Sequence, residues 1–193
     1  MKHINKDHSD LKNSTVYTPE AITNYINKEI IEKSNLKVKR VFDPAVGSGN
    51  LISKLKKDGA FVIGNDIEEV EDNKTDQFFK GDFETFNHKI DDVDLVIMNP
   101  PFNGHPKRKL YPEVFVDKCF ELFGSDIPMI AILPSGWRIN QRVKSKRWRK
   151  IRDNQNITSL VTLPLDIFEG VQFHSEIVVF NIDGLEPIGF LDI

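Results

Sequence analysis

The tetrapeptide Asn99-Pro100-Pro101-Phe102 has the side chains of a site that grips a planar amino group. It follows the apolar run 94–98, which predicts a buried strand. The prolines stiffen the backbone and remove competing N–H donors. The Asn99 side-chain oxygen and the Pro100 carbonyl could accept both amino protons and free the nitrogen lone pair for attack. Phe102 offers a face on which a base can stack. The structural alternative, a rigid proline turn, accounts poorly for the asparagine.

A second chemical signal is the glycine turn 43–50, with the sequence Asp-Pro-Ala-Val-Gly-Ser-Gly-Asn. A buried strand is predicted over 38–45, and a short helix follows the turn. Gly47 and Gly49 allow a tight bend and the close approach of a ligand. The turn is neither the phosphate loop of nucleotide triphosphatases nor a three-glycine dinucleotide motif, which argues against NTP and weakens NAD. An ordinary strand-to-helix turn remains the alternative.

Acidic residues end the next two predicted strands. Asp66 closes the strand predicted over 61–67, where a carboxylate can accept both hydroxyls of a ribose. Asp82 follows a shorter strand and could accept a hydrogen bond from an adenine amino group. Ile67 and Phe83 could sandwich the ring. These positions predict a nucleoside site, with solvated loop acids as the alternative.

The motifs require a scaffold that brings strand ends together. Continuous apolar runs alternate with helical patterns, which predicts a parallel sheet with helices on both faces. Thr18-Pro19-Glu20 predicts a helix start with Thr18 as the hydroxyl cap. Every polar motif falls at the carboxyl end of a strand, where ligands collect in such sheets. Further elements are predicted as a helix over 112–123, strands over 127–133, 157–163 and 176–182, and a short edge strand over 188–193.

Length and composition limit the class of protein. With 193 residues, 39% hydrophobic and 28% charged, the chain predicts one globular domain over 1–193, whose residues 1–15 form a flexible segment. No apolar run reaches membrane-spanning length and no signal peptide is evident, which predicts a cytoplasmic protein without a membrane partner. The single cysteine, Cys119, excludes an internal disulfide and a cysteine-based zinc cluster. No metal site is predicted.

Taken together, Tyr17-Thr18-Pro19, the turn 43–49, Asp66, Asp82 and the tetrapeptide 99–102 resemble the gamma-type DNA adenine-N6 methyltransferases. This group includes the modification subunits of Type I restriction systems. The resemblance extends over about residues 17 to 182. It implies a Rossmann-like class I methyltransferase fold, with a seven-stranded, mostly parallel sheet whose last hairpin is antiparallel. It also implies S-adenosyl-L-methionine as cofactor and the N6 atom of a flipped DNA adenine as methyl acceptor.

The resemblance also implies roles for individual residues. The target base would be held by Asn99, Pro100, Pro101 and Phe102. Phe168 resembles the aromatic residue that packs on the other face of that base, with core packing as the alternative. The cofactor would be bound by Tyr17, Thr18, Asp43, Ala45, Gly47, Gly49, Asp66, Ile67, Asp82 and Phe83.

Positive charge is concentrated in one segment of this chain of net charge −3. Residues 138–152 carry eight Lys or Arg side chains and no acid, and the loop 103–109 is also basic. This distribution favours a polyanion bound at one place, with a solvated face as the alternative. The predicted DNA contacts are Lys107, Arg108, Lys109, Arg138, Arg142, Lys144, Lys146, Arg147 and Arg149.

The sequence departs from the resembled group in size, because no separate target-recognition domain follows the predicted sheet. Specificity could therefore be low, or could come from a specificity subunit or a homodimer partner. Three alternatives remain open at this point. They are methylation of a glutamine amide in a protein, methylation of adenine in RNA, and a cofactor-binding subunit that is active only with its partner.

Overall fold

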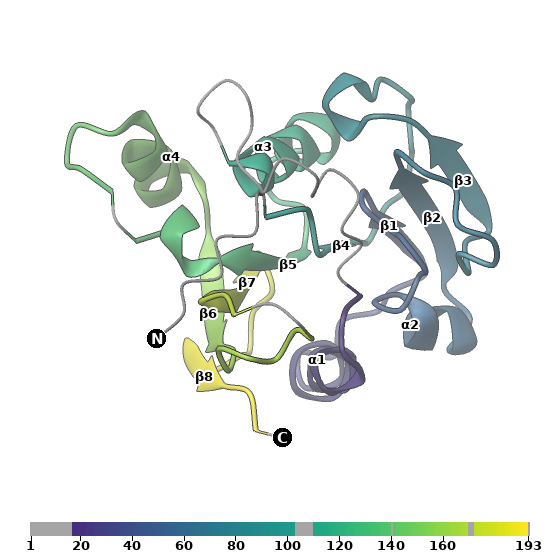
Figure 1. Cartoon of the computed structure of the whole chain (residues 1–193), viewed down its shortest axis with the longest axis horizontal. Coiled ribbons are helices and arrows are strands. Elements are labelled where there is room, and N and C mark those ends of the chain that lie inside the picture. Colours follow the sequence, from purple (N-terminus) through teal and green to yellow (C-terminus); the bar gives the residue numbers. More distant parts are fainter. Residues whose placement is uncertain (1–16, 103–109, 140, 170–171, 193) are drawn as a thin grey trace, which may run out of the picture.

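The computed structural model describes residues 17–102, 110–139, 141–169 and 172–192. Within them one sheet has eight strands, in the order β3-β2-β1-β4-β5-β7-β6-β8 (Figure 1). The strands are β1 (Arg40–Asp43), β2 (Phe61–Asp66), β3 (Gln77–Lys80), β4 (Leu95–Met98), β5 (Met129–Pro134), β6 (Ile157–Thr162), β7 (Ser175–Phe180) and β8 (Ile188–Phe190).

Strands β1 to β5 pair in parallel, and β7 lies antiparallel between β5 and β6. This confirms the predicted α/β fold with a mostly parallel sheet and an antiparallel hairpin. The predicted edge strand also exists, because β8 pairs in parallel with β6 through Leu160 and Ile188. It adds an eighth strand to the seven that the resemblance implied.

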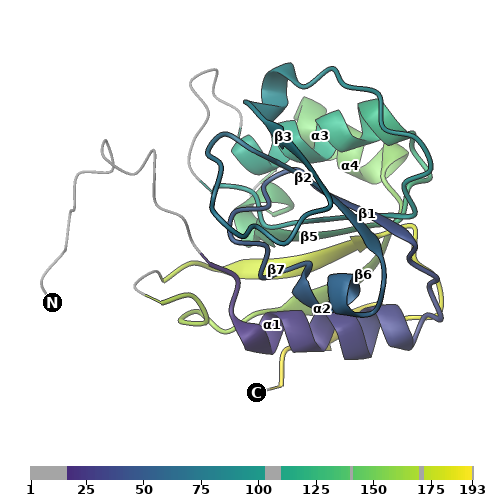
Figure 2. The same ribbon diagram turned by 90° about the vertical axis from the view of Figure 1, so that its right-hand side faces the viewer.

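Helices cover both faces of the sheet, as predicted (Figure 2). One face carries α1 and α2, and the other carries α3 and α4. Helix α1 runs directly into the π-helical turns of η2. The helical segments are α1 (Glu20–Tyr25), η2 (Ile26–Glu32), α2 (Ser53–Lys57), α3 (Tyr111–Phe123) and α4 (Lys146–Asn154), with short 3-10 turns at η3 (Phe83–Thr85) and η4 (Ser135–Trp137).

Two apolar layers lie on the two sides of the sheet because successive strand residues point to opposite faces. In β1, Val41 belongs to the layer beneath α1, whereas Phe42 belongs to the layer beneath α3. Ile22, Ile26 and Ile30 recur at helical spacing and are at most 2% exposed. Burying each of these side chains stabilises the fold by about 1.5–3 kcal/mol.

The connection between β2 and β3 contains no helix or strand over residues 67–74. It folds back over the turn that follows β1, where Lys74 Nζ donates to Asn50 Oδ1 at 3.4 Å. Lys56 forms an ion pair with Asp76 at the start of β3. The connection between β2 and β3 is therefore tied to the turn after β1 and to helix α2.

No helix among the described residues is long and apolar enough to cross a membrane.

Candidate active site

Four polar residues close four neighbouring parallel strands. Asp43 ends β1, Asp66 ends β2, Asn99 directly follows β4, and Asp82 comes shortly after β3. These strands are adjacent in the sheet and share one direction (Figure 1). The structure therefore brings the predicted cofactor residues and the predicted catalytic motif to the same sheet edge.

The glycine turn after β1 depends on backbone conformations that favour glycine. Gly47 and Gly49 have φ angles of 49° and 70°, in the left-handed region. The Gly47 N–H donates to Asp66 Oδ2 at 2.8 Å, which ties the turn to the end of β2. A Cβ on Gly49 would collide with the Asn73 carbonyl oxygen. Gly49 thus accommodates the protein's own β2–β3 connection, a requirement that the sequence analysis did not identify.

The Asp66 carboxylate accepts two backbone hydrogen bonds. Gly47 donates to Oδ2, and the Glu68 N–H donates to Oδ1 at 3.2 Å. Each oxygen retains a second lone pair for an external hydroxyl group. Ile67, the next residue, is 66% exposed and offers an apolar surface beside the carboxylate. This pair could hold a ribose and one face of its base.

Asp82 is exposed and begins η3, where its Oδ1 accepts a hydrogen bond from the Glu84 N–H at 2.9 Å. Phe83 is only 2% exposed. Its ring packs against Phe42 and Phe115, with centroid distances of 5.9 and 5.0 Å. Phe83 therefore anchors the segment that carries Asp82 in the core, and its stacking on a cofactor ring stays a prediction.

Asp43 is a buried acid, 1% exposed, whose Oδ1 accepts a hydrogen bond from the Ala45 N–H at 3.0 Å. Burial raises the pKa of Asp43 to about 8; the Ala45 hydrogen bond opposes this rise, and the nearby Asp66 charge adds to it. Asp43 is therefore mostly protonated at neutral pH. A cation bound beside it would favour release of that proton.

Asn99 is held by a residue distant in sequence. Its Nδ2 donates to Thr18 Oγ1 at 3.1 Å. Because the amide nitrogen is engaged there, Oδ1 is the atom left to accept a proton from a substrate. The prediction that Thr18 caps the helix is wrong, because Pro19 occupies the N-cap of α1 and no side chain bonds there. Tyr17, beside it, is 56% exposed.

Phe102, the last residue of the predicted catalytic motif, contacts two other aromatic side chains. The Phe102 ring meets Phe168 edge-on, at a centroid distance of 6.1 Å. Phe168 is 2% exposed and belongs to the core, which favours the packing alternative for this residue. Phe102 also contacts Phe173 at 5.5 Å, and Phe173 is 41% exposed.

Phe173 is not among the site residues predicted from the sequence. It precedes β7, which is antiparallel to β5, so the amino end of β7 lies at the edge where the parallel strands end. A hydrogen bond joins the end of β5 to the residue before β7: the Ser135 N–H donates to the His174 carbonyl at 2.8 Å. Once the last hairpin is predicted antiparallel, the residues before its second strand become site candidates. That signal was present in the sequence.

A cavity of about 710 Å³ opens beside Phe102. Cavities of this size accommodate small organic ligands. Its walls combine apolar and polar side chains and include Phe102, Phe173, Ile139, Gln141, Gln172 and His174.

Two cations that the sequence analysis assigned to DNA are engaged within the protein. Arg138 donates from Nε and Nη2 to the two oxygens of Glu176, each at 2.9 Å. Glu176 is only 4% exposed. Arg147 donates to Glu113 Oε2 from Nε and Nη2, at 2.9 and 2.6 Å. Both side chains therefore stabilise tertiary contacts, a role that the sequence did not reveal.

Helix α4 docks on α3 largely through charge. Lys150 pairs with Asp117 at 2.6 Å, one turn beyond the contact between Arg147 and Glu113. Among the α4 side chains that the structure describes, Ile151 is the buried one. The acids of α3 thus neutralise one side of the basic segment.

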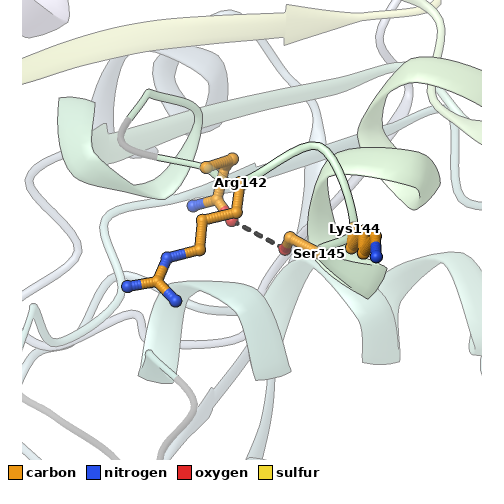
Figure 3. Close-up of a pocket in the computed structure, with 4 residues that line it drawn as sticks. Arg142, Lys144 and Ser145 are labelled. Carbon is orange, nitrogen blue, oxygen red and sulfur yellow. Dashed lines mark hydrogen bonds between the residues drawn. The ribbon is translucent and has the colours of Figure 1, made fainter.

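The remaining predicted DNA contacts in this segment are exposed and form no salt bridge within the described ranges. Around the start of α4, the Arg142 and Lys144 side chains point apart beside a hollow of about 400 Å³ (Figure 3). Ser145 Oγ donates to Gln141 Oε1 at 3.0 Å and caps α4 by accepting from the Trp148 N–H. The exposed cations are Arg142, Lys144, Lys146 and Arg149.

Three further sets of predictions concern the loop before α3, the single cysteine and metal binding. Lys107, Arg108 and Lys109 lie outside the described residues. Cys119 is fully buried, as its apolar helical pattern predicts, and burial raises its pKa. In the part of the chain that is described, no three His, Cys, Asp or Glu side chains are grouped to hold a metal ion.

Solved methyltransferases have similar structures. A modification subunit of a candidate type I restriction enzyme from Vibrio vulnificus YJ016 superposes on 92% of this chain, with a TM-score of 0.70 and 15% identity. The methyltransferase subunit of a type I restriction-modification system from Streptococcus thermophilus superposes on 87%, with a TM-score of 0.71 and 16% identity. The present chain spans only 46% and 45% of these two proteins.

A candidate class I S-adenosylmethionine-dependent methyltransferase from Listeria monocytogenes is also similar. It covers 90% of this chain and is itself covered to 65%, with a TM-score of 0.65 and 19% identity. Neither a protein-family model nor a curated protein matches the sequence. The strand order, the helices on both faces and these superpositions together show that the chain has the fold of class I S-adenosylmethionine-dependent methyltransferases.

Proposed function

We propose that this protein transfers a methyl group from S-adenosylmethionine to the N6 amino group of an adenine in DNA. The observation that carries the proposal is the state of Asn99. Its amide nitrogen is bound to Thr18 Oγ1 at 3.1 Å, which leaves the side-chain oxygen for a substrate. The adjacent strand ends present Asp43 and Asp66, which suit a nucleoside with a cationic amino-acid tail.

The cofactor would be held by the acids at this sheet edge. Asp66 retains lone pairs for two ribose hydroxyls, and exposed Asp82 can accept a hydrogen bond from the adenine amino group. Buried Asp43 would face the positive end of the cofactor, whose charge would oppose the raised pKa and favour release of the Asp43 proton. When bound, the cofactor supplies a methyl group already activated by its positive sulfonium. The remaining task of the protein is to orient the acceptor.

The acceptor amino group would be bound by Asn99 Oδ1 and the Pro100 carbonyl. Each accepts a hydrogen bond from the amino group, which localises the nitrogen lone pair and directs it toward the methyl donor. Phe102 provides a stacking surface for the base, and exposed Phe173 beside it provides a second. A base within a duplex cannot reach this edge, so the adenine must be extruded or already unpaired.

DNA would be held through its phosphates. Arg142 and Lys144 line the hollow of about 400 Å³ before α4, and Lys146 and Arg149 are exposed on α4 itself. Exposed Trp148 adds an aromatic surface among them. Because these contacts would be mainly ionic, binding should weaken steeply with added salt.

A partner would supply sequence specificity. This chain spans less than half of the two type I methyltransferase subunits that it matches, at 46% and 45%. A specificity subunit or a second copy could therefore contribute the target-recognition surface. Activity of the purified chain alone on a defined DNA sequence would contradict this part of the proposal.

The first experiment measures transfer of a labelled methyl group from S-adenosylmethionine to unmethylated DNA, RNA and a protein extract in parallel. We expect N6-methyladenine in DNA, with at least a roughly 100-fold loss in Asn99→Ala, because electrostatic contacts to the reacting group contribute on this scale. The matched control is Asn156→Ala, which removes an exposed asparagine at the amino end of β6, on the opposite sheet edge.

Thr18 variants test the orientation of the amide. Thr18→Val should lower kcat about tenfold because Asn99 loses its anchor, whereas Thr18→Ser keeps the hydroxyl and should retain most activity. Label in RNA or protein, with DNA unlabelled, would replace the proposed substrate by one of those two. Absence of label in all three, despite cofactor binding, would favour the partner-dependent subunit.

A further inference from the structure

Asn65 is a polar residue in the interior of an apolar strand. It lies in β2 and is 1% exposed. Its Oδ1 has no hydrogen-bond partner among the described residues, although the atom is buried. A buried amide that is only half satisfied destabilises a fold, and an apolar side chain of similar size would avoid this cost. The bonds made by the other half of the amide must therefore be the reason for this side chain.

The Asn65 amide nitrogen holds the chain that leaves β3. Nδ2 donates to the Phe79 carbonyl at 2.8 Å and to the Gly81 carbonyl at 3.2 Å. From the same strand, the Asp66 carbonyl accepts the Gly81 N–H at 2.9 Å. Both peptide groups of Gly81 are consequently bonded to β2.

Side chains do not pack on Gly81 itself, because a Cβ placed there would meet no other atom within 4 Å. The next packing contact along the chain is that of Phe83, which is 2% exposed. Asp82 follows Gly81 directly, with an exposed carboxylate. Asp82 therefore lies between two fixed points, the bonds of Gly81 to Asn65 and Asp66 on one side and the buried Phe83 ring on the other.

We propose that Asn65 is a positioning residue that sets Asp82 for recognition of the 6-amino group of the cofactor's adenine. This inference rests on the proposed function, in which Asp82 accepts a hydrogen bond from that group. Asn65 does not touch the cofactor. It determines whether the enzyme distinguishes a 6-amino purine from a 6-oxo purine in its cofactor, and it leaves the remainder of the cofactor site unchanged.

The test compares binding of S-adenosylhomocysteine and S-inosylhomocysteine by titration calorimetry. The inosyl compound has an oxo group in place of the 6-amino group and carries a proton on the adjacent N1. A hydrogen bond to a charged carboxylate favours the adenosine compound by roughly 10- to 100-fold in the wild type. In Asn65→Asp, which exchanges the donor nitrogen for oxygen, this preference should fall at least fivefold, while the affinity for S-inosylhomocysteine stays within twofold.

Two further variants complete the experiment. Asn65→Leu removes both donors without introducing a buried charge, and serves if Asn65→Asp fails to fold. Asn181→Asp is the matched control, because Asn181 Nδ2 likewise donates to two carbonyls, those of Ser125 and Ile127, each at 2.9 Å. Asn181 follows β7 at the opposite sheet edge, and its variant should keep the wild-type preference.

Each outcome has a distinct meaning. A wild type that discriminates, together with Asn65 variants that discriminate equally well or lose both affinities in the same proportion, overturns the positioning role alone. A wild type that binds both compounds equally overturns the inference and the assigned role of Asp82. A wild type that binds neither compound contradicts the proposed function itself.

Discussion

Functional residues were predicted in two regions, the sheet edge where the parallel strands end and the basic segment 138–152. The charged side chains of these two regions are bonded differently. At the edge, the Asp66 and Asp82 carboxylates accept hydrogen bonds from the backbone N–H groups of Gly47, Glu68 and Glu84. In the basic segment, Arg138 and Arg147 bond to the carboxylates of Glu176 and Glu113, which come from other elements.

The difference shows how the context of a charge determines its availability. A carboxylate that accepts a backbone N–H keeps its charge and further lone pairs, so it can still bind a ligand. An arginine in a two-point bond with a buried carboxylate has its charge and geometry committed to the fold. The number of like charges in a sequence segment therefore exceeds the number that is available to bind a partner.

The strongest test of the edge is Gly49→Ala. The new Cβ would collide with the Asn73 carbonyl, and the φ angle of 70° is itself unfavourable for alanine. We expect a loss of about 3 kcal/mol in the free energy of unfolding, measured by urea denaturation. Gly59→Ala is the matched control, since Gly59 has a φ of 95° but no neighbour within 4 Å of a Cβ. Equal losses in both variants would show that the close approach of Asn73 has no importance.

The basic segment is tested next by Glu176→Ala, which leaves Arg138 without its partner. A loss of about 2 kcal/mol in unfolding free energy is expected, because Arg138 is partly exposed and water can replace some of the lost bonds. Lys144→Ala should change stability by no more than about 0.5 kcal/mol. Equal unfolding free energies for Glu176→Ala and Lys144→Ala would contradict the distinction between cations that are paired within the fold and cations that are exposed.

DNA binding sharpens the same distinction. The double variant Arg142→Gln/Lys144→Gln should bind duplex DNA about tenfold more weakly, and the slope of log affinity against log salt should fall by about 2. Fluorescence anisotropy at several salt concentrations measures both. Lys37→Gln/Lys57→Gln removes two exposed lysines elsewhere and serves as control. An unchanged slope in the first variant would exclude these cations from the interface.

A further test of the edge concerns Asp43 and pH. Because burial raises its pKa from 3.8 to about 8, the native protein binds a proton that the unfolded chain releases between these values. This group therefore makes the wild type less stable as pH rises from about 4 to about 8. Asp43→Asn removes the titration but can still accept the Ala45 hydrogen bond. The melting temperature of Asp43→Asn minus that of the wild type should increase from pH 5 to pH 8. A difference that stays constant over this range would contradict the raised pKa of Asp43.

Local sequence patterns predicted the scaffold well because apolar periodicity reports which faces of an element are buried. The runs before Asp43, Asp66 and Asn99 became β1, β2 and β4, and the isoleucine spacing after Pro19 became a helix. A motif at a strand end consists of only a few adjacent residues, so its residue types and its position can be recognised from the sequence. Phe173 was missed because its access to the site depends on the direction of β7.

By itself, the sequence determined the order of strands and helices and the polar residues that end each strand, since both follow from short-range pattern and backbone preference. Only the tertiary structure decided which charges remain available, because ion pairs such as Arg138 with Glu176 join residues far apart in the chain. The same holds for the contact of Thr18 with Asn99 and for the bond from Asn65 to Gly81. Their partners meet only after the sheet has assembled.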